Sequence, residues 1–182
     1  MSQSLQTTNT VCLVVDIQER LTPVLHEAAS LVANSSLLLQ GLNALGVPLL
    51  LTEQYPKGLG GTLAEIRRYF AEDALIVEKT RFSAYVAEVA DFIEEQQVKN
   101  VIVIGAEAHV CMLQTVLDLR AQGLAVYVPF ECTTSRNPLN KDNALQQMRE
   151  AGAIVSNIES LLFMLLQDAK HLAFKTISKL IQ

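Results

Sequence analysis

The stretch VIVIGAEAHVCMLQTVLDLRAQG, residues 101–123, joins a run of four branched apolar residues to a segment with helical spacing. A continuous apolar run is typical of a strand that is covered on both faces of a sheet. Gly123 is a typical residue at a helix end, so we predict a helix over residues 110–122. A buried strand that leads straight into a helix is the repeating unit of parallel α/β proteins. The stretch therefore predicts an α/β fold, with the thiol of Cys111 near the junction.

The same pattern recurs along the rest of the chain. Five further apolar runs predict strands at residues 11–15, 47–51, 74–77, 124–128 and 153–155. Segments with helical spacing lie between them at residues 24–45, 62–70, 86–96 and 141–151. With right-handed crossovers these elements give a doubly wound, three-layer α/β sandwich around a six-stranded parallel sheet, a Rossmann-like arrangement.

Length and composition restrict the class of protein. A chain of 182 residues with 50% apolar residues suits one domain over residues 1–182, with residues 158–182 as a helical tail that packs on the sheet or forms a subunit interface. The net charge of −5 opposes a general nucleic-acid binder. The polar residues 1–10 do not resemble a secretory leader, and no apolar stretch is long enough for a membrane span. We expect a cytoplasmic protein with no nucleic-acid or membrane partner.

Functional-looking side chains follow the first four predicted strands. Asp16 follows the first strand, a glycine-rich loop at residues 52–61 follows the second, Lys79 follows the third and Cys111 follows the fourth. Ligands of open α/β sheets bind outside the carboxyl ends of the strands. These groups are therefore expected to meet at one edge of the sheet.

Each of the three side chains also has an ordinary structural interpretation. A lone cysteine is most often a small buried hydrophobe, and an aspartate at a strand end often caps the next turn. At the start of a helix, however, unpaired N–H groups and a nearby ammonium from Lys79 would lower the thiol pKa of Cys111. Asp16 would need a charged partner and could accept the thiol proton. Together, Asp16, Lys79 and Cys111 form a plausible catalytic set.

Several other chemistries lack their motifs. The chain has neither a phosphate-binding P-loop nor a dinucleotide fingerprint, and a phosphoacceptor domain would carry an aspartate where Lys79 stands. His26, His109 and His171 lack the spacing of metal ligands. We therefore expect no cofactor and no metal. Cys12 falls within the first predicted strand and Cys132 has no comparable context, so neither is a candidate nucleophile.

Four segments together resemble the isochorismatase-like cysteine hydrolase superfamily: VVDIQ, TEQYPKGLGGT, EKTRFSAY and GAEAHVCMLQTVLDLRAQG. The similarity extends to about Leu165 and is greatest to the branch of isochorismatase domain-containing hydrolases that carries TEQYPKGLG. It implies a six-stranded parallel sandwich and a catalytic triad of Asp16, Lys79 and Cys111. It also implies a cis peptide between Ala106 and Glu107, and an oxyanion hole formed by N–H groups of this turn and of Cys111.

The resemblance further implies hydrolysis of a C–N bond, as in an amide or carbamate, in a small-molecule substrate through a thioester intermediate. The loop after the second strand lacks the histidine of zinc nicotinamidases, and true isochorismatases, which cleave a vinyl ether, need no cysteine nucleophile. Family members often complete their pockets with a neighbouring subunit, so a homo-oligomer (dimer or higher) is expected. The expected pocket residues, of which Phe82 and Tyr85 could equally serve in packing or in a subunit contact, are Glu53, Gln54, Tyr55, Phe82, Tyr85 and His109.

Two other functions fit the same residues. A catalytically idle member of the family would bind a small molecule or act as a scaffold. A reactive thiol at Cys111 could instead sense oxidants, with Cys132 as a resolving cysteine if the fold brought it near.

Overall fold

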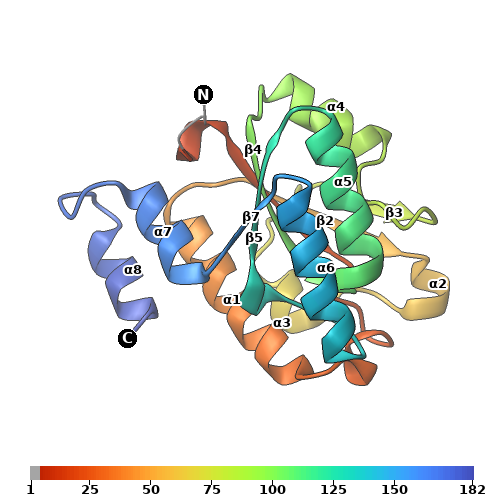
Figure 1. Ribbon diagram of the computed structural model, residues 1–182. Coiled ribbons are helices and arrows are strands. Elements are labelled where there is room, and N and C mark those ends of the chain that lie inside the picture. Colours follow the sequence, from red (N-terminus) through yellow and green to blue (C-terminus); the bar gives the residue numbers. More distant parts are fainter. Residues whose placement is uncertain (1–4) are drawn as a thin grey trace.

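The computed structural model describes residues 5–182, so the start of the polar segment 1–10 lies outside the described residues. A parallel sheet forms the centre of the molecule, with strands in the order β3-β2-β1-β4-β5-β7 and β6 paired with β4 (Figure 1). The strands are β1 (Thr10–Val15), β2 (Leu49–Gln54), β3 (Ile76–Lys79), β4 (Asn100–Ala106), β5 (Ala125–Pro129), β6 (Thr133–Thr134) and β7 (Ile154–Ser156). This order is that of a doubly wound sheet and confirms the predicted fold class.

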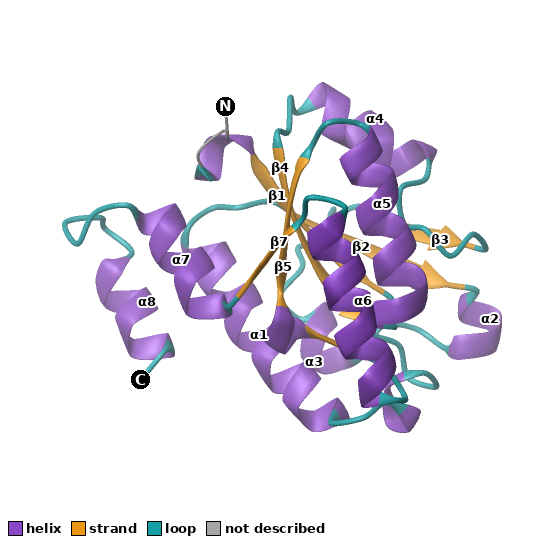
Figure 2. Cartoon of the chain, in the orientation of Figure 1, coloured by secondary structure: helices purple, strands orange, loops and turns teal. Residues whose placement is uncertain are grey.

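Helices cover both faces of the sheet, giving three layers (Figure 2). The helices are α1 (Ala28–Ala44), α2 (Pro56–Leu59), α3 (Ala64–Arg67), α4 (Ala87–Glu95), α5 (Leu113–Ala121), α6 (Pro138–Glu150), α7 (Ile158–Leu166) and α8 (Phe174–Leu180). One core packs α1, α3, α7 and α8 against one face, and a second core packs α4, α5 and α6 against the other. β1 and β4 lie at the centre of the sheet, and every residue of both strands is buried.

Alternation along β1 explains why a continuous apolar run is needed there. Cys12 and Val14 belong to the core beneath α1, whereas Val11, Leu13 and Val15 belong to the core beneath α5. Because successive side chains of a strand point to opposite faces, a polar residue at any of these positions would be buried on one face or the other.

Each of the six predicted strands corresponds to an observed strand, shifted by one to three residues. The two-residue strand β6 was not predicted, because Thr133 and Thr134 are too short a run to show a pattern. The helix predicted over residues 62–70 is wrong in extent, since α3 forms a single turn over Ala64–Arg67. The glycine-rich loop contains the unpredicted short helix α2, which begins at Pro56 as the fixed φ of proline favours.

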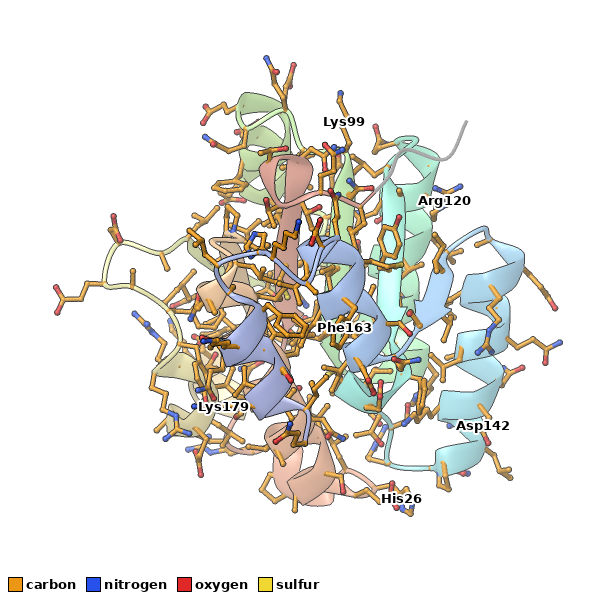
Figure 3. The ribbon with its side chains drawn as sticks, turned by 90° about the vertical axis from the view of Figure 1, so that its left-hand side faces the viewer. His26, Lys99, Arg120, Asp142, Phe163 and Lys179 are labelled. Atoms are coloured by element: carbon orange, nitrogen blue, oxygen red, sulfur yellow. The ribbon has the colours of Figure 1, made fainter. Side chains whose placement is uncertain are left out.

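The carboxyl-terminal tail packs on α1 and on the core beneath it. Leu161, Leu162 and Ile177 are fully buried, and a Cβ added at Gly41 of α1 would lie 2.7 Å from Leu162. Figure 3 shows this side of the molecule, with Phe163 on α7 and Lys179 on α8 labelled. Packing within the chain thus accounts for much of the apolar side of the tail, and its role in a subunit interface stays a prediction. No helix described within residues 5–182 has the length and apolar character to cross a membrane.

Candidate active site

Three side chains meet at the carboxyl edge of the sheet. Asp16 follows β1 with a positive φ of 55°, Lys79 is the last residue of β3, and Cys111 lies in the turn after β4. The Lys79 Nζ atom is 2.7 Å from Asp16 Oδ2, and the Cys111 thiol lies close enough to the Asp16 carboxylate for each group to shift the pKa of the other. The fold therefore brings together three residues that are separated by up to 95 positions in sequence.

Asp16 is the centre of this cluster. Its side chain is completely buried, and Lys79 donates a hydrogen bond to its Oδ2 atom. The Thr52 hydroxyl of β2 donates to its Oδ1 atom at 2.9 Å. Because a buried carboxylate is costly without partners, these contacts explain how a charge is held at the end of an apolar strand.

Lys79 is held as firmly as Asp16. Its side chain is 1% exposed, and besides Asp16 its ammonium contacts Gln54 Oε1 at 2.7 Å. It also donates to the carbonyl oxygens of Arg81 at 3.2 Å and Phe82 at 3.0 Å. Four oxygen atoms around one ammonium compensate for the loss of water on burial.

The thiol pKa differs from the expectation drawn from the sequence. Burial and the Asp16 carboxylate raise the pKa of Cys111 to about 12, and the opposing effect of Lys79 is smaller. The prediction of a lowered pKa is therefore wrong, because burial outweighs the ammonium. Burial also raises the pKa of Asp16, against the effect of Lys79. The resting thiol is thus neutral and lies beside a carboxylate that can accept its proton.

The turn that carries Cys111 has an unusual backbone. Gly105 has a φ of 127°, and a Cβ there would lie 1.9 Å from the carbonyl oxygen of Val15 in β1. The peptide bond between Ala106 and Glu107 is cis. Cys111 lies in a π-helical turn, Ala108–Met112, that precedes α5, so the prediction that it lies in the first turn of the α-helix is corrected.

The expected pocket residues are placed in different ways. Gln54 joins the cluster through Lys79, and Tyr55 and Phe82 are 55% and 53% exposed. Glu53 does not join it, because its Oε1 atom accepts hydrogen bonds from the backbone and hydroxyl of Thr62. Tyr85 packs partly against the core beneath α4 and α5, and His109 Nδ1 lies 2.9 Å from the Ser135 hydroxyl.

Gln18 was not singled out from the sequence. Its side chain is completely buried and bonds to the backbone of Gln54 in both directions, donating to the carbonyl at 3.1 Å and accepting from the N–H at 2.7 Å. It also donates to the Gly60 carbonyl at 2.7 Å. Gln18 therefore ties the loop after β1 to the glycine-rich loop. Its place in VVDIQ, two residues after Asp16, was a signal that could have identified it.

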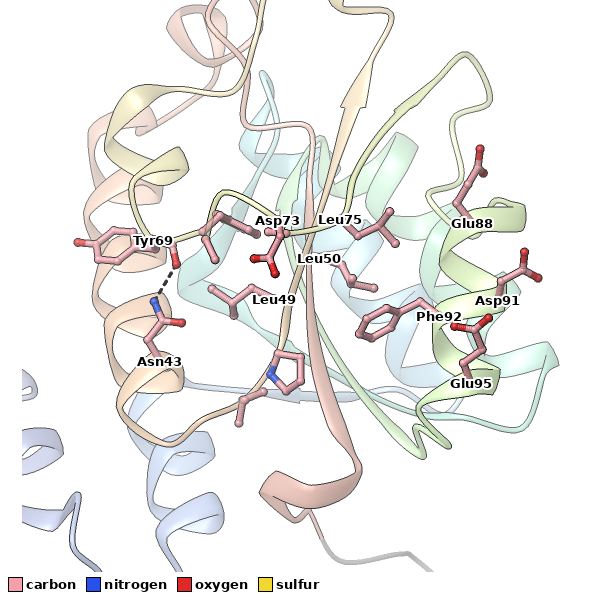
Figure 4. A pocket seen from close by; sticks show the side chains of 15 residues that line it. Asn43, Leu49, Leu50, Tyr69, Asp73, Leu75, Glu88, Asp91, Phe92 and Glu95 are labelled. Carbon is pink, nitrogen blue, oxygen red and sulfur yellow. Dashed lines mark hydrogen bonds between the residues drawn. The ribbon is translucent and has the colours of Figure 1, made fainter.

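Two of the cavities in the described part of the chain lie at opposite ends of the strands. Figure 4 shows a cavity of about 710 Å³ at the amino-terminal ends of β2 and β3, lined by residues that include Leu49, Leu75 and Phe92. A cavity of about 300 Å³ borders Lys79 and Tyr55 at the opposite edge of the sheet. Neither is lined by Asp16 or Cys111. The larger cavity is therefore not the site that the triad would serve.

The other thiols and the potential metal ligands form no comparable centre. Cys12 and Cys132 are both buried, and burial raises the pKa of each. Both thiols belong to the core beneath α1. Within residues 5–182, no group of three or more His, Cys, Asp or Glu side chains could hold a metal ion.

Comparison with known proteins identifies the family of the chain. The family model described as the isochorismatase domain matches residues 10–160. Isochorismatase domain-containing protein 1 of Salmo salar is 38% identical over 174 residues, which are 95% of this chain and 61% of that protein. Isochorismatase domain-containing protein 2 of Danio rerio is 36% identical over 97% of this chain and 89% of that protein. The chain therefore spans less than two thirds of the first relative and most of the second.

A solved structure extends the likeness to three dimensions. The MAR1 ribonuclease of Caenorhabditis elegans superposes with a TM-score of 0.94 at 36% identity, covering 98% of this chain and 92% of that one. On the family model and on these relatives, the chain belongs to the isochorismatase-like hydrolase family.

Proposed function

We propose that the chain is a metal-free cysteine hydrolase that cleaves a C–N bond, of the amide or carbamate type, in a small molecule. The observation that carries the proposal is the buried Asp16 carboxylate, which contacts the Lys79 ammonium and the Cys111 thiol at once. A nucleophile in contact with a base, which is itself held by a third group, is the arrangement expected for covalent catalysis.

In the first half-reaction Asp16 accepts the thiol proton while the Cys111 sulfur attacks the substrate carbonyl carbon. Because the thiol pKa is raised, proton transfer accompanies attack, and no standing thiolate is needed. The tetrahedral oxyanion receives hydrogen bonds from backbone N–H groups of the turn that carries Cys111. Asp16 then delivers the proton to the leaving nitrogen, and the C–N bond breaks to leave a thioester.

The second half-reaction reverses the proton transfer. Asp16 removes a proton from water, whose oxygen attacks the thioester carbonyl, and the sulfur leaves with the proton returned through Asp16. Lys79 stays charged throughout and stabilises the carboxylate form of Asp16. The products are an amine and a carboxylic acid from an amide, or an amine and a carbonic acid half-ester from a carbamate.

RNA is a second substrate class, because three structural relatives carry the name MAR1 ribonuclease. The net charge of −5 opposes RNA binding, since phosphate backbones are held by lysine and arginine stripes. Small molecules are therefore the favoured substrates. Tyr55 and Phe82, exposed near Lys79, are suited to cover by a neighbouring subunit in a homo-oligomer.

The test is hydrolysis of an amide and carbamate panel, with a short single-stranded RNA as a separate arm. We expect Cys111→Ala to lower turnover by about 10³-fold or more, and the wild-type protein to accumulate an acyl adduct on Cys111 that mass spectrometry detects. Cys12→Ala is the matched control, because it removes a thiol of the core and should leave turnover within about threefold of wild type.

Two results would contradict the proposal. Wild-type turnover in the Cys111→Ala variant would show that Cys111 is not the nucleophile. Ligand binding with no hydrolysis in any arm would favour the idle binding protein instead.

A further inference from the structure

Glu107 is a buried carboxylate that the proposed mechanism leaves without a role for its side chain. The residue is 6% exposed and follows the cis peptide bond, four positions before Cys111. Its negative charge raises the pKa of Cys111 in the same sense as Asp16 does. Placing a second carboxylate near the thiol opposes the reaction unless a cation neutralises it.

Arg136, in the loop between β6 and α6, supplies that cation. Its Nε atom lies 3.1 Å from Glu107 Oε1 and 3.2 Å from Oε2. Its backbone N–H donates to Oε2 at 2.9 Å. The side chain and the backbone of Arg136 thus both donate hydrogen bonds to the Glu107 carboxylate. The Arg136 side chain is 62% exposed and that of Glu107 only 7% exposed. The loop therefore pairs a buried carboxylate with a guanidinium at the surface.

The same loop contacts the turn at two further points. Thr133 and Thr134 of β6 pair with Gly105 and Ala106 at the end of β4. The next residue, Ser135, is completely buried and places its hydroxyl 2.9 Å from Nδ1 of His109. Residues 133–136 therefore contact the chain from the end of β4 to His109, two positions before Cys111.

We propose that Arg136 is a positioning residue that acts on the nucleophile through Glu107, whose carboxylate it neutralises in the turn that carries Cys111. The inference rests on the proposed function, in which Cys111 must lose its proton during attack. Arg136 acts through Glu107 and makes no contact with the sulfur in its own right.

Three charged groups act on this thiol: Asp16 from the end of β1, Lys79 from β3, and Glu107 from the turn itself. His109 also belongs to the turn, and its ring contacts the Ser135 hydroxyl. Arg136 comes from the loop packed against the turn. Removing Arg136 leaves two carboxylates and one ammonium near the sulfur, whereas removing the Glu107 charge leaves one carboxylate, the ammonium and the guanidinium. The two changes therefore have opposite electrostatic effects on thiolate formation.

The experiment measures the alkylation rate of Cys111 by neutral iodoacetamide, read by mass spectrometry between pH 7 and 9. At these pH values the rate follows the thiolate fraction, because the thiol pKa lies well above them. We expect Arg136→Met to slow alkylation about three- to tenfold and Glu107→Gln to accelerate it by a similar factor. Arg136→Lys, which keeps the charge, should recover most of the rate. Arg149→Met, at an exposed position of α6, is the control for the same loss of net charge.

A purely structural role makes a different prediction. Loosening the turn would change access to the sulfur in the same direction in both variants. Equal directions, or changes no larger than that of Arg149→Met, would overturn the inference. The assay needs no turnover, so it remains readable if every substrate fails. A hydrolase in which the two variants alkylate like wild type would retain the proposed function and lose this inference.

Discussion

Replacing Lys79 by methionine tests how the buried ion pair is balanced. The substitution keeps most of the side-chain volume and removes the ammonium that lies 2.7 Å from Asp16 Oδ2. Asp16 would retain its hydrogen bond from Thr52 and the neighbouring thiol of Cys111 but would have no counter-charge. Removing one partner of a buried pair costs about 3–5 kcal/mol. We expect that loss in the free energy of unfolding at pH 8, measured by urea denaturation.

The loss should depend on pH, because an uncompensated carboxylate takes up a proton. In the variant the folded-state pKa of Asp16 lies further above its unfolded value than it does in wild type. The contribution of Asp16 to the free energy of unfolding is then complete below its unfolded-state pKa. It is lost as the pH rises through its folded-state pKa, at roughly 1 kcal/mol per pH unit. The destabilisation by Lys79→Met should therefore be smaller by about 1–3 kcal/mol at pH 5 than at pH 8.

Two further variants make the result specific. Asp16→Asn added to Lys79→Met removes the unpaired charge and should recover much of the lost stability, most clearly at pH 8. Lys57→Met, at an exposed position, should stay within about 0.5 kcal/mol of wild type. A Lys79→Met cost below about 1 kcal/mol at pH 8, or an equal cost at pH 5 and pH 8, would refute this account of the pair.

Two other predictions follow from the backbone and from the buried thiols. Gly105→Ala should destabilise the fold by more than about 3 kcal/mol in urea denaturation, because its Cβ would clash with the Val15 carbonyl oxygen. Gly123→Ala is the control and should cost about 1 kcal/mol, because a Cβ there has nothing within 4 Å. Similar costs for the two variants would contradict the close approach at Gly105. Because the folded-state pKa values of the buried thiols are raised, their contribution to the free energy of unfolding is complete below about pH 8.5 and is lost as the pH rises above it. The urea midpoint should therefore fall from pH 8 to pH 10, and it should fall less steeply in Cys132→Ala. An unchanged slope in that variant would contradict the raised pKa of Cys132.

Much of the fold was accessible from local pattern. The runs at residues 11–15 and 101–104 are apolar at every position, which is typical of a strand covered on both faces, and both lie in central strands. Asp16, Lys79 and Cys111 were found together because chain direction in a parallel sheet sends every strand end to the same edge. That inference needed the order of the elements and no distance between them.

Other features depended on the complete tertiary structure. The direction of the Cys111 pKa was predicted wrongly, because the helix start and Lys79 are visible in the sequence, whereas burial sums over every element packed around the sulfur. The contact between Glu107 and Arg136 joins residues 29 positions apart through a two-residue strand that leaves no periodic signal. Local sequence determined which groups arrive at the carboxyl edge of the sheet. Tertiary packing decided their charge states and their partners. The physical reason is that burial and contact distances exist only after segments distant in sequence have packed against one another and excluded water.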